Sequence, residues 1–192
     1  VTPDRRQPVT ARAVTAPGGA FAHTVLVANG REQGIERGNP VVTADGLVGL
    51  VVDVGATYAR VLMISDINAQ IPVILSSSSW PGVTVGNNGT FLSLRFLPEE
   101  AAPKVGELVL TSGHGGVLPA GVPVGRVDLV RDDFVRVRPA VDLRHLSYVS
   151  ILVGGTEGID LDNLALEDYY TPLPETECTR LFEGVNAAGE RQ

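Results

Sequence analysis

The sequence predicts an all-β fold built from two small barrels related by an internal repeat, and three observations lead to it. Segments such as Leu92–Phe96 alternate apolar and polar residues, which is the period of a strand with one buried face. Asp-Gly at 45–46 and Asn-Gly at 88–89 separate such segments and indicate hairpin turns, the first of type I′. The first half of the chain also aligns on the second half.

The repeat can be read directly from the sequence. GLVVDVGATYARVLMISD at Gly49–Asp66 aligns without gaps on GRVDLVRDDFVRVRPAVD at Gly125–Asp142, with Gly, Val, Arg and Asp in corresponding places. Upstream of each block, the pattern Gly-x-x-Val-x-Thr begins at Gly38 in the first copy and at Gly106 in the second. Ordered agreement over two blocks favours a duplicated structural unit.

The copies differ between the Thr of that pattern and the next Gly. The first copy passes from Thr43 to Gly49 in six steps, whereas the second takes fourteen from Thr111 to Gly125. The longer stretch, TSGHGGVLPAGVPVG, is interpreted as an expanded hairpin in which glycines supply positive φ angles and prolines stiffen the return. The predicted structural motif comprises Gly38, Asp45, Gly46, Gly49, Gly106, Thr111, Gly113, Gly116, Pro119, Gly121 and Gly125.

The same patterns predict four regions along the chain. Residues 1–19 form an N-terminal segment with at most one edge strand, and residues 20–76 form the first barrel. Residues 77–154 form the second barrel together with the connecting stretch 77–89, which adds a strand to one of the two lobes, without the sequence indicating which. Residues 155–192 form an acidic tail that is expected to be disordered, because it has little to bury.

Charge and composition exclude several classes of protein. Residues 1–155 carry 13 acidic and 13 basic residues with no basic stripe evident in the sequence, which argues against nucleic-acid binding. Cys178 is the single cysteine, so neither an internal disulfide nor a cysteine metal site is expected, and the three histidines lack metal-ligand spacing. No cofactor motif occurs. Because the chain begins at Val1, it is expected to be a piece of a longer protein.

A serine hydrolase is one hypothesis, because the two β lobes carry His23, Asp45 or Asp66, and Ser112 in the order of a chymotrypsin-like triad. The local context argues against it. Ser112 lies in Leu-Thr-Ser-Gly-His, not in a Gly-Asp-Ser-Gly loop whose amides form an oxyanion hole. His114 with its neighbouring glycines lacks the Gly-x-Ser-x-Gly turn of a lipase.

Two pairs of charged residues occupy matching places in the repeat. Asp66 and Asp142 are predicted to share a structural role, such as capping the turn after a strand. Arg60 and Arg136 also correspond, and each is expected to pair with the aspartate of its own lobe, Asp66 or Asp142.

Two stretches resemble the bacterial rod shape-determining MreC family: GIERGNPVVTADGLVGLVVDVGATYARVLMISDINAQIPV and VGELVLTSGHGGVLPAGVPVGRV. The similarity extends from about Ala13 to Val153, and His114 stands where the family pattern is variable. The resemblance implies two barrels like those of trypsin-like proteases but without the catalytic triad. It also implies a domain on the periplasmic face of the cytoplasmic membrane, anchored by a helix that precedes it.

The resemblance further implies a non-catalytic scaffold of the cell-elongation machinery that organises and activates peptidoglycan synthesis. The implied partners are a class B penicillin-binding protein, MreD, MreB indirectly, and the protein itself as dimers or filaments. Tyr58, Trp80 and Phe91 are candidate partner-binding residues, since aromatic side chains near loops are common anchors.

Two other functions stay open from the sequence. A hydrolase using His23, Asp66 and Ser112 would react with a fluorophosphonate probe at Ser112, whereas a scaffold would not. A β module that binds a cell-wall ligand would be retained on isolated sacculi without any partner protein.

Overall fold

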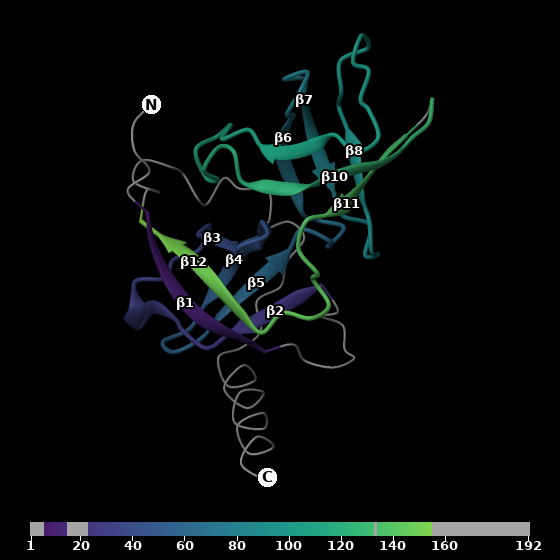
Figure 1. Ribbon diagram of the computed structural model, residues 1–192. Helices are drawn as coiled ribbons and strands as arrows, with labels where there is room; N and C mark the ends of the chain where they lie inside the picture. Colours follow the sequence, from purple (N-terminus) through teal and green to yellow (C-terminus); the bar gives the residue numbers. More distant parts are fainter. Residues whose placement is uncertain (1–5, 15–22, 133, 155–192) are drawn as a thin grey trace.

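The computed structural model describes residues 6–132 and 134–154, except 15–22, and it contains twelve strands and one short 3-10 helix, η1 (Arg31–Gln33). The strands form two closed antiparallel barrels of six strands each, one beside the other (Figure 1), which confirms the all-β prediction. The acidic tail, 155–192, lies outside the described residues. Among the described residues, no helix has the length and apolar character needed to cross a bilayer.

The first barrel closes in the order β1-β12-β3-β4-β5-β2. Its strands are β1 (Gln7–Val14), β2 (Thr24–Val27), β3 (Pro40–Val42), β4 (Leu47–Val54), β5 (Ala59–Met63) and β12 (Tyr148–Val153).

The second barrel closes in the order β10-β11-β8-β7-β6-β9. Its strands are β6 (Gln70–Leu75), β7 (Pro81–Val85), β8 (Leu92–Arg95), β9 (Leu108–Thr111), β10 (Pro123–Val130) and β11 (Val135–Pro139).

Membership of the barrels corrects the boundaries expected from the sequence. β6, expected in the first barrel, belongs to the second, and β12, expected in the second, closes the first. β1 is not an edge strand, because it pairs with β12 on one side and with β2 on the other. A closed barrel leaves no unpaired edge, so the first barrel must take a strand from the end of the chain. Residues 77–89 contribute a strand, as expected, and the structure assigns this strand, β7, to the second barrel, which the sequence left open.

The strand pairing supports the duplication residue by residue. The β4–β5 pairing shifts by a bulge between Val51 and Asp53, and the β10–β11 pairing shifts between Val127 and Leu129, which are the corresponding places in the repeat. The barrel orders also correspond: β12 lies between β1 and β3 as β6 lies between β7 and β9. The two units are therefore the same fold with one strand supplied from different ends of the sequence.

Matching glycines explain why these strands can approach so closely. A Cβ atom on Gly49 would lie 1.9 Å from the carbonyl oxygen of Leu62, and one on Gly125 would lie 2.2 Å from that of Arg138. Leu62 and Arg138 are themselves corresponding residues of the repeat. Both positions need glycine because no side chain fits between the strands.

Each barrel has a buried apolar core, and the core of the second extends into the first. The cluster centred on Ile71, Val109 and Val137 also includes Leu47 and Ile64 of the first barrel. The barrels therefore share an apolar contact, and burial of apolar surface stabilises a protein by about 25 cal/mol per Å².

Both predicted hairpins are present, but their turns differ from the expectation. A type I′ turn needs positive φ at both central residues, whereas at the 45–46 turn only Gly46 has one, of 155°. Thr43 closes the loop instead: its N–H donates to the Gly46 carbonyl at 2.8 Å, and its Oγ1 accepts from the Asp45 N–H at 3.3 Å. A Cβ on Gly46 would lie 2.2 Å from the carbonyl oxygen of Pro123, so contact with the second barrel decides this turn.

The turn at Asn88-Gly89 is also shaped by contact between barrels. Asn88 has a left-handed φ of 58°, which asparagine tolerates better than most residues. Its N–H donates to the Ser65 carbonyl at 2.9 Å, and its side-chain oxygen accepts from the Ile67 N–H at 2.9 Å. Ser65 and Ile67 follow β5, so this turn joins the second barrel to the first.

Candidate protein-interaction surface

The loop from Thr111 to Gly125 is a structural element at the joint between the barrels. Thr111 is fully buried; its hydroxyl donates to the Pro119 carbonyl at 2.6 Å and accepts from the Val122 N–H at 2.9 Å. Four glycines have positive φ, as expected for an expanded hairpin: Gly113 (73°), Gly115 (79°), Gly116 (74°) and Gly121 (85°).

The same loop contacts the first barrel directly. A guanidinium nitrogen of Arg6 donates to the Gly116 carbonyl at 2.7 Å. Val117 and Leu118 are buried in the core cluster that also holds Leu47 and Ile64. The eight-residue expansion in the second copy thus fills the space between the barrels and helps to fix their relative orientation.

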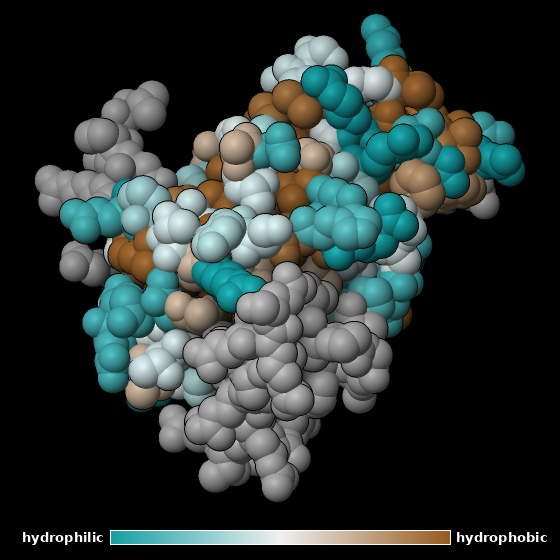
Figure 2. All heavy atoms as spheres, turned by 60° about the horizontal axis from the view of Figure 1, so that its bottom comes forward, coloured by the Kyte–Doolittle hydropathy of each residue, from teal (hydrophilic) through white to brown (hydrophobic). Residues whose placement is uncertain are grey.

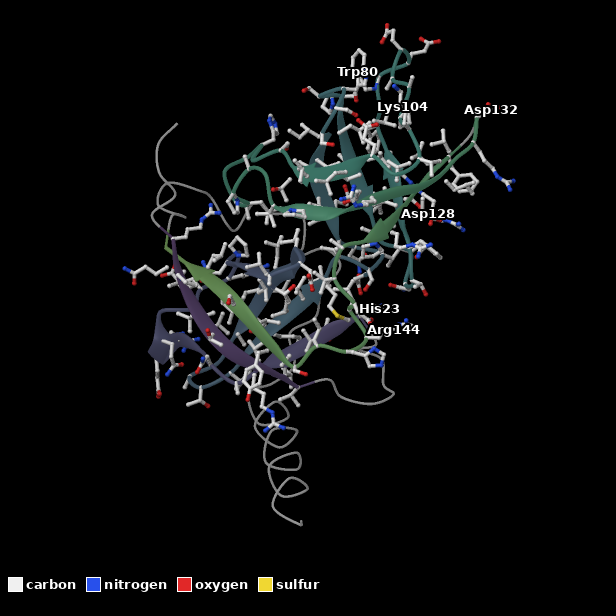
Figure 3. The ribbon with its side chains drawn as sticks, in the orientation of Figure 1. His23, Trp80, Lys104, Asp128, Asp132 and Arg144 are labelled. Carbon is white, nitrogen blue, oxygen red and sulfur yellow. The ribbon has the colours of Figure 1, made fainter. Side chains whose placement is uncertain are left out.

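The residues of the hydrolase hypothesis make hydrogen bonds to backbone groups. The Ser112 hydroxyl accepts from the His114 N–H at 3.2 Å. Asp66 accepts from the Asn68 N–H at 2.8 Å, and the carbonyl of His23 accepts from the Met63 N–H. Within the described residues, the hydrogen bonds of Ser112 give no serine–histidine–carboxylate relay, and Figure 3 places His23 on the first barrel.

The paired aspartates have the shared structural role that the repeat predicts. Asp142 accepts from the N–H of Arg144 at 3.1 Å, two residues further on, as Asp66 does from the N–H of Asn68. Both carboxylates therefore cap the turn that follows a strand. The Nδ1 of His145 also lies 2.8 Å from an Asp142 oxygen, and this contact, followed by the Arg144 N–H, lowers the pKa of Asp142.

The arginine pairing expected from the repeat is wrong in its partners. Arg60 lies 3.7 Å from Asp53, not at Asp66, and Arg136 pairs with Asp128, not with Asp142. Each arginine reaches across to the neighbouring strand of its own barrel, because Asp66 and Asp142 lie in turns beyond the strands.

The three candidate anchors divide into one buried and two half-buried side chains. Tyr58 is only 5% exposed and packs with Leu26, so it is not a surface anchor, which corrects the expectation. Trp80 packs partly against the second core, at the end of the second barrel far from the first (Figure 3). Phe91 lies beneath Arg136, whose guanidinium carbon is 4.2 Å from the ring centroid, a cation–π geometry.

Sequence reasoning missed the apolar residues that are most exposed. Phe96 is 75% exposed and Val105 is 67% exposed on the second barrel, and Tyr148 is 66% exposed on the first. Phe96 also has a left-handed φ of 57°, which is strained for a bulky residue. Alternation alone could not identify Phe96, because the pattern Leu92–Phe96 predicts that its side chain is buried with Leu92 and Leu94.

Four arginines lie on the outward side of β8, β10 and β11, where they alternate with buried residues of the same strands. We call this surface the arginine face: Arg95, Arg126, Arg136 and Arg138. This corrects the expectation that the body carries no basic stripe. Asp128 is the only acidic residue within the three strands, and it accepts from Arg136 at 2.8 Å and from Arg138 at 2.7 Å. These two guanidinium groups hold the pKa of Asp128 below its ordinary value. Figure 2 shows hydrophilic residues gathered over part of the second barrel, beside hydrophobic patches.

A buried carboxylate, that of Glu107, connects two turns at the end of the second barrel. Glu107, 8% exposed, accepts from the Lys104 N–H at 3.1 Å and from the N–H and hydroxyl groups of Ser77 and Ser78. Burial by itself raises the pKa of Glu107, but the combined hydrogen bonds from Ser77, Lys104 and Ser78 outweigh it and lower the pKa below its usual value.

Comparison with known proteins gives a consistent family. A family model described as "Rod shape-determining protein MreC, barrel core" matches residues 14–153. The cell shape-determining protein MreC of Caulobacter vibrioides (strain NA1000 / CB15N) is 38% identical over 143 residues, which are 74% of this chain and 41% of that protein. MreC of Cereibacter sphaeroides is 35% identical over 144 residues, 75% of this chain and 48% of the relative. The chain thus spans less than half the length of these two relatives.

Solved structures agree with the fold. The crystal structure of MreC from Pseudomonas aeruginosa is 30% identical with a TM-score of 0.71, covering 76% of this chain and 98% of that chain. Two more distant structures share the fold alone. One is the major periplasmic domain from the cell shape-determining filament MreC, at 19% identity and a TM-score of 0.68, covering 78% and 99% of the two chains. The other is a complex between penicillin-binding protein PBP2 and MreC from Helicobacter pylori, at 17% and 0.58, covering 78% and 100%.

Proposed function

Because this chain belongs to the rod shape-determining MreC family, we propose that it is a non-catalytic scaffold that organises peptidoglycan synthesis during cell elongation. The observation that carries the proposal is the match over residues 14–153, which spans β2 to β12 and so eleven of the twelve strands. The periplasmic face of the cytoplasmic membrane is the proposed location, with a preceding helix as anchor. MreD and, indirectly, MreB are further proposed partners.

The proposed main partner is a class B penicillin-binding protein. A structural neighbour from Helicobacter pylori is a complex of MreC with PBP2, and another neighbour is described as a filament. Contact with a synthase and contact between copies are therefore both proposed for this chain. A scaffold of this kind acts by binding one conformation of its partner more tightly than another, and about 1–3 kcal/mol of difference shifts the equilibrium 5–150-fold.

We assign Phe96 as the main anchor for that partner. Phe96 is 75% exposed, and its strained backbone holds the ring at the end of β8. Strain of about 1–3 kcal/mol persists only where surrounding structure enforces it, and buried aromatic anchors dominate many protein interfaces. Trp80 and Phe91, half-buried on the same barrel, are proposed to border the contact.

The test is retention of the organism's class B penicillin-binding protein on the immobilised chain. Phe96→Gly removes the ring and relieves the positive φ, so the fold should be at least as stable as the original. We expect it to weaken binding by about 2 kcal/mol, which is roughly 30-fold in Kd. Tyr148→Ala, an exposed aromatic of the first barrel, is the matched control and should bind normally.

Two results would contradict this proposal at different levels. If the unmodified chain does not retain the synthase, the scaffold role toward that partner fails. If Phe96→Gly binds as well as the original, the scaffold role stands and the assignment of Phe96 is wrong.

A further inference from the structure

The three strands that form the arginine face carry more positive than negative charge. Arg126 is directly opposite Arg138 in the β10–β11 register, and like charges in that relation destabilise a sheet. Asp128 offsets part of this repulsion through its bonds to Arg136 and Arg138. Four arginines against one carboxylate give the three strands an excess of three positive charges.

The side chains of this face are also arranged to meet an anion in solvent. Arg138 is 67% exposed and Arg136 is 39% exposed in their side chains, while Arg95 and Arg126 are exposed. Phe91 lies beneath Arg136 and Arg138. The guanidinium carbons of these two arginines are 4.2 and 5.7 Å from the Phe91 ring centroid, so the ring restricts both groups. Arginine groups that are already oriented lose little entropy when they bind a carboxylate.

The complementary charge lies in the same chain. Residues 156–192 contain nine acidic residues against Arg180 and Arg191, whereas residues 1–155 are balanced. We propose that the acidic segment 157–190 binds the arginine face of its own molecule, through several carboxylates that exchange among the four guanidinium groups. This inference does not depend on the scaffold role.

Tethering makes the intramolecular contact attainable. The 24 residues from Gly155 to Cys178 can span at most about 80 Å, which exceeds the dimensions of a body whose radius of gyration is about 15 Å. Covalent attachment over such a length gives an effective concentration of about a millimolar, so weak ion pairs are sufficient. The contact should be strong at low ionic strength and screened at high ionic strength.

The single cysteine allows a direct test on the full chain. A nitroxide spin label on Cys178, the only cysteine of the sequence, would broaden backbone amide signals of residues that the tail visits. We expect broadening on β8, β10 and β11, and not on β3, at about 0.03 M salt, with loss of the effect at about 0.5 M salt.

Matched variants separate charge from fold. Arg126→Glu with Arg138→Glu should abolish the broadening, whereas Arg12→Glu, an exposed arginine on β1, should leave it nearly intact. Replacing the nine acidic residues of the tail by their amides should abolish it as well, without any change in the barrels. Absence of broadening at low salt, or broadening that survives either charge change, would overturn the proposal.

Other occupants give distinct results. Broadening seen only when labelled and isotope-enriched chains are mixed would mean that the tail binds a second copy, which contradicts the intramolecular contact. Binding of the face to vesicles that contain an anionic phospholipid, with no broadening from Cys178, would assign the face to a membrane surface instead.

Discussion

The two barrels have the same strand order and the same bulge, but they differ in the side chains that close their turns and in the exposure of their matching arginines. Gly38 and Gly106 have φ of 84° and 89°, and their N–H groups donate to the corresponding carbonyls of Val51 and Val127, both at 2.7 Å. The frame therefore depends on a small set of backbone contacts that survive wide divergence of side chains.

The same turn is closed by different chemistry in each barrel. In the first barrel the Glu36 N–H donates to the Asn39 side chain at 2.8 Å, and in the second the Lys104 N–H donates to Glu107 at 3.1 Å. The amide of Asn39 serves one turn, whereas the longer, charged Glu107 also reaches the hairpin at Ser77. The second barrel thus gained a titratable contact that the first barrel lacks at this position.

The matching arginines differ most in exposure. Arg60 is 1% exposed in the first barrel, whereas the side chain of Arg136 is 39% exposed in the second. The two arginines therefore occupy corresponding positions in their sheets. Their surroundings differ, so that the charge of Arg60 is buried in the protein and the charge of Arg136 is partly exposed to solvent.

The largest effect is expected where the two barrels are most alike. Gly49→Ala and Gly125→Ala each place a methyl group within about 2 Å of a facing carbonyl oxygen, so each should lower the free energy of unfolding by about 3 kcal/mol. Chemical denaturation measures both. Gly34→Ala, with positive φ but open space around it, is the control and should cost about 1 kcal/mol. Unequal losses at Gly49 and Gly125 would break the equivalence of the copies.

The corresponding threonines should behave differently. Thr111→Val leaves the Pro119 carbonyl and the Val122 N–H without their buried partner, and it should cost about 2 kcal/mol. Thr43→Val in the first barrel loses only one longer contact at the surface, to the Asp45 N–H, and should cost under about 1 kcal/mol. Thermal unfolding of both variants tests whether the expanded loop depends on its threonine; equal losses would contradict that dependence.

The charge on Glu107 should make stability depend on pH. Because its pKa in the folded protein is lowered, its contribution is complete above the ordinary pKa of 4.5 and is lost as pH falls through the lower folded value. Glu107→Gln should cost about 1–2 kcal/mol at neutral pH and reduce the loss of stability on acidification. Unfolding midpoints measured at several acidic pH values test this. An unchanged pH dependence in Glu107→Gln would show that other carboxylates control it.

The smallest effect is expected at the residues that resemble an active site. Ser112→Ala and His114→Ala should each change stability by no more than about 0.5 kcal/mol, because Ser112 contributes a single exposed bond to the His114 N–H. Binding to the penicillin-binding protein should be unchanged. Loss of function in Ser112→Ala with an intact fold would reopen the hydrolase hypothesis.

Much of the fold could be predicted from local patterns, because strand periodicity and turn residues report on the backbone of their own segment. The repeat predicted the shared roles of Gly49 and Gly125 and of Asp66 and Asp142. The candidate surface was predicted less well. Tyr58 is buried and Phe96 is exposed, since exposure depends on neighbours that a single strand pattern does not contain.

The sequence by itself determined that the chain is all-β, contains a duplication and resembles one family, since these properties follow from local residue patterns along the chain. Only the tertiary structure decided that β12 closes the first barrel, that the expanded loop lies at the joint, and that four arginines from three strands share one face. The physical reason is that barrel closure and lateral strand pairing bring together residues far apart in sequence. Closure depends on which strand pairs with the last unpaired edge, and the alternation of residues within one strand does not identify that partner.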